Sequence, residues 1–185
     1  MKRIADLDPA AFTAEQRRIY AKIAGGPRRG VRGPLAVWLH CPGLADTAQA
    51  LGRYCRYETS LPARLSELAI LTLGRAWSAE YEWWAHKPIA LKAGVSEAVI
   101  DAIRDRAVPP FECEDEALVY EFMAALDSQR TIPDGLYARA AAMLGSGGVV
   151  DLVGIAGYYT LISMTIKVFN LMPPAGSPHE MSGLS

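Results

Sequence analysis

Two side chains capable of acid–base chemistry lie four residues apart in the stretch SAEYEWWAHKPIALKAG, residues 78–94. Positions four apart lie on one face of an α-helix, so Glu82 and His86 can hydrogen-bond or share a proton. A third ionisable residue, Glu67, lies in the apolar stretch RLSELAILTL. Because an imidazole beside two carboxylates is easily protonated and can stabilise a developing anion, these three residues are candidates for proton transfer.

The two stretches are expected to form a helical hairpin that turns near Ser78. With about 1.5 Å of rise per residue, Glu67 lies roughly 16 Å from this corner along one helix and His86 about 12 Å along the other. Glu67 and His86 can therefore face each other. A carboxylate near the core boundary needs a charge partner, or its pKa rises, and either state suits proton transfer.

The same residues also have a purely structural interpretation. Glu82 and His86 can form an ordinary surface pair, and Glu67 can be the partner of Arg64 or Arg75. Both interpretations are compatible with the spacing. Three tryptophans near the corner are expected to pack in the core or an interface rather than form a binding platform: Trp77, Trp83 and Trp84.

Helix starts and stops recur along the chain and strand patterns are nearly absent, which predicts an all-α fold. Thr13 begins TAEQ, a capping box for a helix that ends near Ala24. The following segment, GGPRRGVRG at 25–33, is predicted to be an irregular basic loop. Further helices are expected over 34–40, from Pro42 to about Tyr57, and over 63–77, 79–93, 97–106, 114–126 and 133–144.

Within the helix that follows Pro42, large and small apolar residues recur at spacings of three and four. This periodicity predicts one buried apolar face. Its members are Leu44, Ala48, Leu51 and Cys55.

The most apolar segment, residues 149–169, is predicted to be a buried central or interface helix. Asp151 and Lys167 leave about 15 uncharged residues between them, short of the roughly 20 that a bilayer requires. Gly154 and Gly157 permit close backbone approach, and the apolar surface exceeds what one small domain readily hides. A homo-oligomer, whether a dimer, trimer or hexamer, is therefore expected, and no membrane partner.

The chain length of 185 residues suits one domain over 1–185, with termini 1–12 and 172–185 expected to be extended or mobile. The formal charge of -1, from 19 basic and 20 acidic side chains, has no concentrated block, so nucleic acid is not an expected partner. The N-terminus lacks the continuous apolar core of a signal peptide, which favours a cytoplasmic location.

Three cysteines lie far apart and outside any metal-ligand or Cys-x-x-Cys spacing: Cys41, Cys55 and Cys113. They are expected to be reduced, mostly buried thiols, and no metal or cofactor is expected.

The stretch RLSELAILTLGRAWSAEYEWWAHKPIALKAGVSEAVIDAI, residues 64–103, resembles the carboxymuconolactone decarboxylase and alkylhydroperoxidase D-like family. Supporting fragments are GPLAVWLHCPGLA upstream and EDEALVYEFMAAL and GGVVDLVGIAGYYTLISM downstream. The resemblance covers most of the chain. It implies an all-helical alkylhydroperoxidase D-like domain with a central helical hairpin that assembles into oligomers.

In the redox branch of that family, a glutamate on the first helix is followed on the second by Cys-x-x-Cys-x-x-x-His. Matching by position places Glu67 and His86 on the glutamate and the histidine, with Tyr81 at a proton-relay position. Ala79 and Glu82 occupy the two cysteine positions. Because a thiolate is the attacking species in such chemistry, the match is to a branch lacking Cys-x-x-Cys, and a thiol-dependent antioxidant is the disfavoured alternative.

The resemblance to the decarboxylase branch implies different chemistry. A carboxylated unsaturated lactone loses carbon dioxide, electrons pass into a conjugated enolate, and an acid protonates carbon without a cofactor. His86 would stabilise the anion, Glu67 and Glu82 would act as proton donor and its partner, and Tyr81 would orient the substrate or relay a proton.

The substrate does not transfer with the fold, so a related lyase, isomerase or lactone-processing step on a small unsaturated acid fits equally. Arg75 and His40 are candidates for binding a substrate carboxylate. A third alternative is a non-catalytic helical assembly or binding module, which predicts no cavity beside Glu67 and His86.

Overall fold

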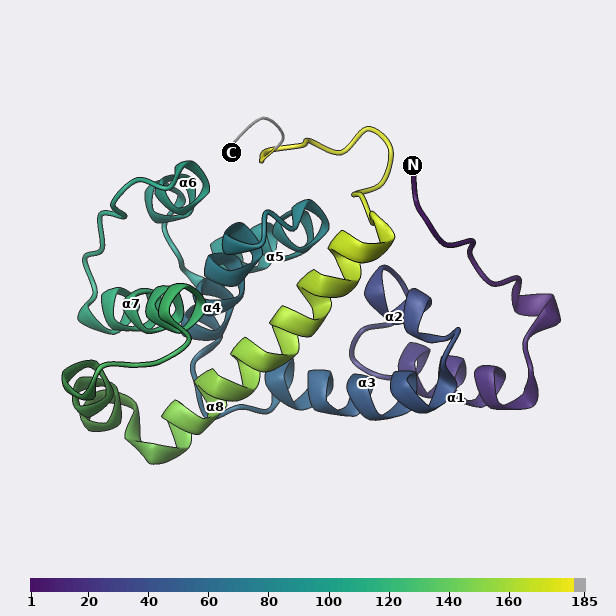
Figure 1. Ribbon diagram of the computed structural model, residues 1–185, viewed down its shortest axis with the longest axis horizontal. Coiled ribbons are helices and arrows are strands. Elements are labelled where there is room, and N and C mark those ends of the chain that lie inside the picture. Colours follow the sequence, from purple (N-terminus) through teal and green to yellow (C-terminus); the bar gives the residue numbers. More distant parts are fainter. Residues whose placement is uncertain (182–185) are drawn as a thin grey trace.

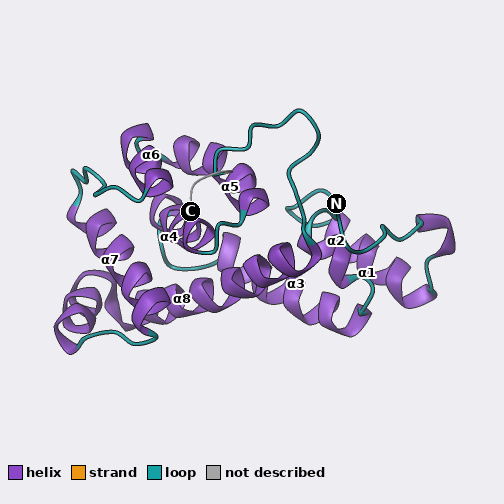
Figure 2. Cartoon of the chain, turned by 45° about the horizontal axis from the view of Figure 1, so that its top comes forward, coloured by secondary structure: helices purple, strands orange, loops and turns teal. Residues whose placement is uncertain are grey.

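The computed structural model describes residues 1–181 of the chain. This part consists of helices and loops and contains no strand (Figure 1, Figure 2). The predicted all-α class is confirmed. The elements are η1 Pro9–Ala11, α1 Ala14–Ala24, α2 Pro34–Trp38, α3 Pro42–Tyr57, α4 Ala63–Ala76, α5 Glu80–Ala93, α6 Glu97–Asp105, α7 Glu114–Gln129 and α8 Asp134–Phe169.

The long helix α8 runs diagonally through the molecule and contacts α3, α4 and α7 (Figure 1). Gly145 adopts φ 71° and ψ 168°, which only glycine reaches readily, so the predicted boundary after 144 is a one-residue break. By length and composition α8 could cross a bilayer, but 61% of its most apolar window is buried inside the protein. The prediction of a buried central helix agrees with this packing.

Asp151 lies within this apolar part of α8 and is buried. Its carboxylate accepts hydrogen bonds from the Tyr54 hydroxyl at 2.7 Å and from the Ser60 amide and hydroxyl, each at 2.7 Å. Burial raises the pKa of Asp151, but these hydrogen bonds outweigh burial and lower it. Asp151 therefore ties α8 to the end of α3 and the loop before α4.

The predicted hairpin is formed by α4 and α5. Pro62 precedes α4, the chain reverses at Ser78 with φ 46°, and α5 ends at Gly94 with φ 102°. Helix α4 is buried along nearly its whole length because α5, α7 and α8 surround it. The site-bearing helix α5 is thereby held against the core of the domain.

The predicted buried face of α3 is wrong in part. Ala48 and Cys55 are buried, but Leu44 and Leu51 are 41% and 48% exposed. Small residues face α8 instead, and a Cβ built on Gly52 would lie 2.1 Å from the Tyr158 ring. Close approach to a large side chain of α8, rather than the size of the α3 residues, decides which face of α3 is buried.

Both termini of the described chain lie against the helices. The Arg3 amide donates to the Phe169 carbonyl at 3.0 Å, and Phe12 is buried. Residues 172–181 contain no helix, in line with the expected extended tail, but Met181 is buried. The remainder of that predicted segment, 182–185, lies outside the described residues.

Candidate functional site

Helices α4 and α5 bring the three predicted proton-transfer residues together. The imidazole of His86 donates from Nδ1 to Glu67 Oε2 at 2.6 Å and from Nε2 to Glu82 Oε1 at 3.0 Å. Each of the three residues is at most 4% exposed. These three residues form a hydrogen-bonded chain of side chains, Glu67–His86–Glu82, and all of it is buried. The alternative of an ordinary surface pair is therefore wrong.

Burial and charge act in opposite directions on His86. Burial disfavours the imidazolium, but the Glu67 and Glu82 carboxylates outweigh this effect and raise the pKa of His86 to about 9. His86 is therefore an imidazolium at neutral pH, with both N–H groups donated to carboxylates. A proton that moves from His86 must move along one of these two hydrogen bonds.

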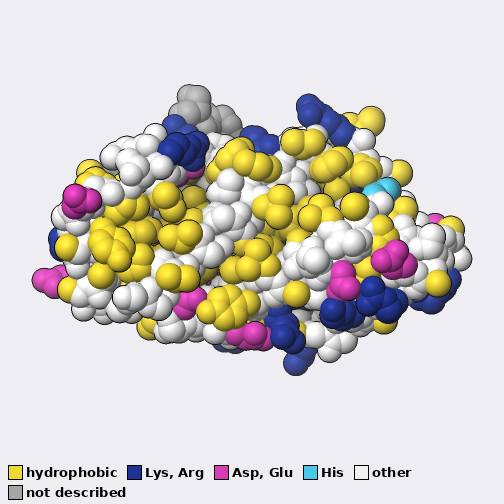
Figure 3. Space-filling model, turned by 60° about the horizontal axis from the view of Figure 1, so that its bottom comes forward, with side chains coloured by type: hydrophobic (Ala, Val, Ile, Leu, Met, Phe, Trp, Pro, Cys, Tyr) yellow, Lys and Arg dark blue, Asp and Glu magenta, His cyan; other side chains and the backbone are white. Residues whose placement is uncertain are grey.

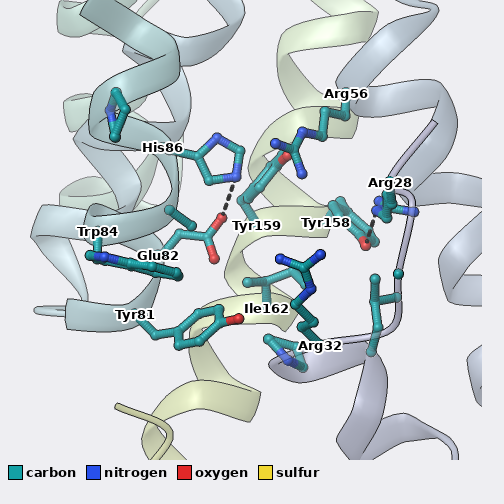
Figure 4. A pocket seen from close by; sticks show the side chains of 15 residues that line it. Arg28, Arg32, Arg56, Tyr81, Glu82, Trp84, His86, Tyr158, Tyr159 and Ile162 are labelled. Atoms are coloured by element: carbon teal, nitrogen blue, oxygen red, sulfur yellow. Dashed lines mark hydrogen bonds and ion pairs between the residues drawn. The ribbon is translucent and has the colours of Figure 1, made fainter. Parts of the chain in front are cut away.

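A cavity of about 370 Å³ opens beside Glu82 and His86 (Figure 4). Glu67 does not line it and lies on the other side of the imidazole, so Glu82 connects the buried chain to the cavity. Tyr81, Glu82, Trp84 and His86 of α5 form one wall, Tyr158, Tyr159 and Ile162 of α8 form the floor, and Arg28, Arg32 and Arg56 lie opposite α5.

Three arginines give this cavity an excess of positive charge. Arg28 donates to the Tyr158 hydroxyl and to the Gln49 carbonyl, both at 3.3 Å, which anchors the basic loop on α8 and α3. Within residues 1–181, no carboxylate pairs with Arg32 or Arg56. Guanidinium groups without a carboxylate partner are suited to bind a planar anion such as a carboxylate.

The tyrosines around the cavity remain protonated at neutral pH. The Tyr159 ring packs edge-on against the His86 ring with centroids 5.2 Å apart, and burial raises the pKa of Tyr159 well above its ordinary value. Burial also raises the pKa of Tyr158 to about 12. For Tyr81, burial and then Glu82 raise the pKa, against the smaller opposing effect of Arg32. All three hydroxyls can therefore donate a hydrogen bond to a bound anion.

Tyr81 is held by the basic loop. Gly33 has φ 56°, and a Cβ at this position would lie 2.5 Å from the Tyr81 ring. The absence of a side chain lets the loop backbone contact Tyr81 directly. Tyr81 lines the cavity as a neighbour of Glu82, which is compatible with the predicted orienting or relay role.

Two sequence candidates do not reach the cavity. Arg75 is buried and donates to the Arg104 carbonyl and to the Ser78 hydroxyl, and burial lowers its pKa. His40 is exposed, with Nε2 at 3.0 Å from the Ala5 carbonyl. The structure therefore gives both residues local partners and does not place either one where it could hold a cavity-bound carboxylate.

The structural alternative for Glu67 is also not observed. Arg64 pairs with Asp115 at 2.7 Å and with Glu116 at 2.6 Å, both on α7. Arg75 has the partners described above. Glu67 therefore pairs with His86, as the hairpin geometry predicts.

Several cavity residues escaped sequence reasoning. Trp84 was expected to pack in a core or interface but lines the cavity, whereas Trp83 is 1% exposed and does pack. The basic composition of the loop 25–33 was a usable signal for Arg28 and Arg32. No local pattern marked the residues that α3 and α8 contribute to the cavity: Arg56, Tyr158 and Tyr159.

None of the three cysteines lines the cavity. Cys55 is buried, and burial raises the pKa of its thiol to about 11. Cys41 and Cys113 are exposed, so the expectation that the thiols are mostly buried is wrong. Glu82, not a thiol, faces the cavity next to His86. In the part of the chain that the structure describes, no group of three or more His, Cys, Asp or Glu side chains is placed to hold a metal ion.

The comparisons with known proteins agree with the helical hairpin. The model of the carboxymuconolactone decarboxylase family matches residues 42–125. This range includes Glu67, Glu82, His86 and Arg56, whereas the basic loop and α8 lie outside it. No curated protein matches the chain. The chain is therefore similar to the carboxymuconolactone decarboxylase family over residues 42–125, the range that contains the buried residues Glu67, Glu82 and His86.

Proposed function

We propose that the protein is a cofactor-independent enzyme that transfers a proton at carbon in a small unsaturated acid or lactone, as a decarboxylase or a related lyase. The observation that carries this proposal is the buried chain Glu67–His86–Glu82, which ends at an arginine-lined cavity. Positive charge opposite an acid–base pair suits an anionic substrate whose reaction develops further negative charge. A cytoplasmic location remains the expectation.

The arginines would bind and orient the substrate. Arg32 and Arg56 would hold a carboxylate that remains on the substrate or the oxygen of a developing enolate, and Tyr81 would donate a hydrogen bond to it. Stabilising this oxygen more strongly in the transition state than in the ground state accelerates the reaction. Arg28, already engaged by Tyr158 and Gln49, would keep the loop in place.

In a decarboxylation, the carbon–carbon bond to the departing carboxylate breaks and its electron pair enters the conjugated enolate as carbon dioxide leaves. The His86 imidazolium then passes its proton along the hydrogen bond to the Glu82 carboxylate, and Glu82 delivers this proton to carbon. His86 regains its proton from solvent, and Glu67 keeps the imidazole oriented. In an isomerisation, Glu82 first removes a proton and later returns one, so the same residues serve both reactions.

A turnover assay in D2O tests this proposal. Purified protein is incubated with carboxymuconolactone and with a panel of unsaturated dicarboxylic acids and their lactones, while proton NMR follows substrate loss and deuterium incorporation and a separate assay follows carbon dioxide. Decarboxylation gives carbon dioxide and one deuterium on carbon, whereas isomerisation gives deuterium without carbon dioxide. Glu82→Gln and His86→Ala should lower kcat at least about 100-fold, the usual contribution of acid–base catalysis.

The circular dichroism of both variants should remain helical. Turnover of an identified substrate that survives His86→Ala would contradict the assigned role of His86. Absence of turnover and of deuterium exchange across the panel would favour the non-catalytic alternative, although that alternative expected no cavity and the structure has one.

The arginine assignment has a matched control in the same loop. Arg32 lines the cavity, whereas Arg29 is exposed and does not line it. Loss of one charged hydrogen bond of about 1.5–3 kcal/mol should raise KM, or the Kd of a competing dicarboxylate, roughly 10- to 100-fold for Arg32→Gln. Arg29→Gln should leave both constants unchanged. Equal effects of the two substitutions would show that only general loop charge matters.

A further inference from the structure

The C-terminal segment lies across the outer side of α5. After α8 the described chain returns past the hairpin, and residues 180 and 181 lie beside α5 (Figure 1, Figure 2). There the Glu80 carboxylate accepts the amide N–H of Glu180 at 2.7 Å and that of Met181 at 3.2 Å. Glu80 is 9% exposed and Met181 is 4% exposed. A buried carboxylate of α5 is thus satisfied by backbone donors that are a hundred residues away in sequence.

A second carboxylate makes the reciprocal connection. Glu180 Oε2 accepts from Lys87 Nζ at 2.5 Å and from Trp83 Nε1 at 3.4 Å, and Arg104 of α6 lies 3.7 Å away. Burial raises the pKa of Glu180, but the bonds from Lys87 and Trp83 outweigh burial and lower it. The segment therefore connects α5 to α6 through ionised groups as well as through its backbone.

These contacts lie on the side of α5 that faces away from the site. Glu80, Trp83 and Lys87 are three and four residues apart, so they share one helix face. With 3.6 residues per turn, Glu82 and His86 lie about 200° and about 240° around the helix from Glu80, so both lie on another face. A shift or rotation of α5 on its outer side would therefore move both site residues relative to α4.

Helix α5 has few supports of its own. Its N-cap residue, Ala79, makes no side-chain capping hydrogen bond, and Pro88 lies inside the helix. A missing cap and an interior proline both remove stabilising hydrogen bonds. The position of α5 consequently depends on its packing against α4 and α8 and on the segment that crosses its outer face.

We propose that residues 178–181 form a strap that positions α5, with Glu80 and Glu180 as positioning residues that keep Glu82 and His86 in register with Glu67 and the arginine wall. Neither residue lines the cavity, so their effect on the site is exerted through α5. Only the effect of the strap on turnover rests on the proposed function. Its effect on the geometry of His86 can be measured without a substrate.

The double variant Glu80→Ala/Glu180→Ala in the full chain tests the strap. The control is Glu97→Ala, which removes an exposed carboxylate from the first turn of α6 and leaves the strap intact. Hydrogen exchange at the amides of Glu180 and Met181 reports release of the strap, and NMR titration of the His86 ring reports the distance to its carboxylates. In the double variant we expect faster exchange and a fall in the His86 pKa of about one unit or more, the size expected when a close opposite charge is weakened.

The control should change neither measurement. If the double variant does not fold, Glu80→Gln, which removes the charge but retains one acceptor, should produce smaller changes in the same directions. A released strap with an unaltered His86 titration would overturn the proposal. Where a substrate has been identified, the double variant should show a fall in kcat that is larger than its change in KM. If the wild type shows no turnover but its His86 titration still depends on the strap, the proposed function is refuted and the strap is not.

Discussion

The carboxylate of Glu82 joins the buried His86 imidazole to the cavity. It occupies a position where the redox branch that the chain resembles carries a cysteine, and it binds His86 from the cavity side. A thiolate there could take part in redox chemistry, whereas a carboxylate has no redox chemistry of this kind and is suited to exchange protons or carry charge. The second carboxylate, Glu67, binds the opposite ring nitrogen and keeps the imidazole charged despite its burial.

The charge on His86 predicts how stability depends on pH. The folded-state pKa of about 9 exceeds the ordinary value of 6.5, so the stabilisation is fully present below pH 6.5 and is lost as the pH rises through 9. The loss should be on the order of 3 kcal/mol across this window. Chemical unfolding at closely spaced pH values measures it, and the window lies below the range in which Tyr158 and Cys55 titrate.

His86→Gln provides the control for that experiment, because it removes the titrating group while retaining hydrogen-bonding capacity. We expect a lower overall stability and a flatter pH dependence between 6.5 and 9. A wild-type stability that is constant over this range would mean that His86 is not held as an imidazolium.

The three thiols supply a second prediction at the residue scale. A variant with Cys41, Cys55 and Cys113 all replaced by alanine should retain its turnover of an unsaturated acid or lactone, because none of these residues lines the cavity. It should show the same negligible peroxide consumption as the wild type. Peroxide consumption by the wild type that disappears with one cysteine would restore the thiol-dependent alternative.

At the scale of elements, small residues decide how α3 meets α8. Gly52 leaves room for the Tyr158 ring and for the guanidinium of Arg28, which a Cβ would approach to 2.1 Å and 2.7 Å. Tyr158 also packs edge-on against Trp38, with ring centroids 6.2 Å apart. The floor of the cavity is therefore positioned by a close contact between two helices and a loop.

Two glycines of the same helix test this packing. Gly52→Ala should lower stability by about 1–3 kcal/mol through overpacking and should weaken binding of a dicarboxylate, because Tyr158 and Arg28 must move. Gly43→Ala, where a Cβ meets nothing within 4 Å, should leave stability unchanged or raise it by up to about 1 kcal/mol. Thermal unfolding and isothermal titration measure both effects, and an equal response of the two variants would contradict the packing argument.

At the scale of the whole molecule, an apolar face remains uncovered in the single chain. Figure 3 views the lower side of Figure 1, and hydrophobic side chains extend across it, with charged side chains mostly near its rim. Exposed apolar residues of α3 and α8 include Leu44, Leu51, Val150, Val153 and Val168. Gly154 faces Cys55 within the chain, whereas a Cβ on Gly157 would meet open space. An apolar face of this extent is typical of an interface.

We therefore expect a homo-oligomer that uses the exposed faces of α3 and α8. Val153→Glu places a charge on this surface and should reduce the mass measured by light scattering at micromolar concentration to that of one chain. Val108→Glu, in the loop after α6 where the side chain is 93% exposed, should leave the mass unchanged. A wild type that is monomeric under these conditions would contradict the expectation.

Local patterns in the sequence were sufficient for the all-α class, for the α4–α5 hairpin with its corner at Ser78, and for the meeting of Glu67, Glu82 and His86. They were sufficient because helix periodicity, capping and the rise per residue are properties of short segments. Only the tertiary structure decided that Arg32 and Arg56, rather than Arg75 and His40, face the cavity. It also decided the burial of His86 and the contact of the tail with α5, because burial and long-range contacts arise only when distant segments pack together.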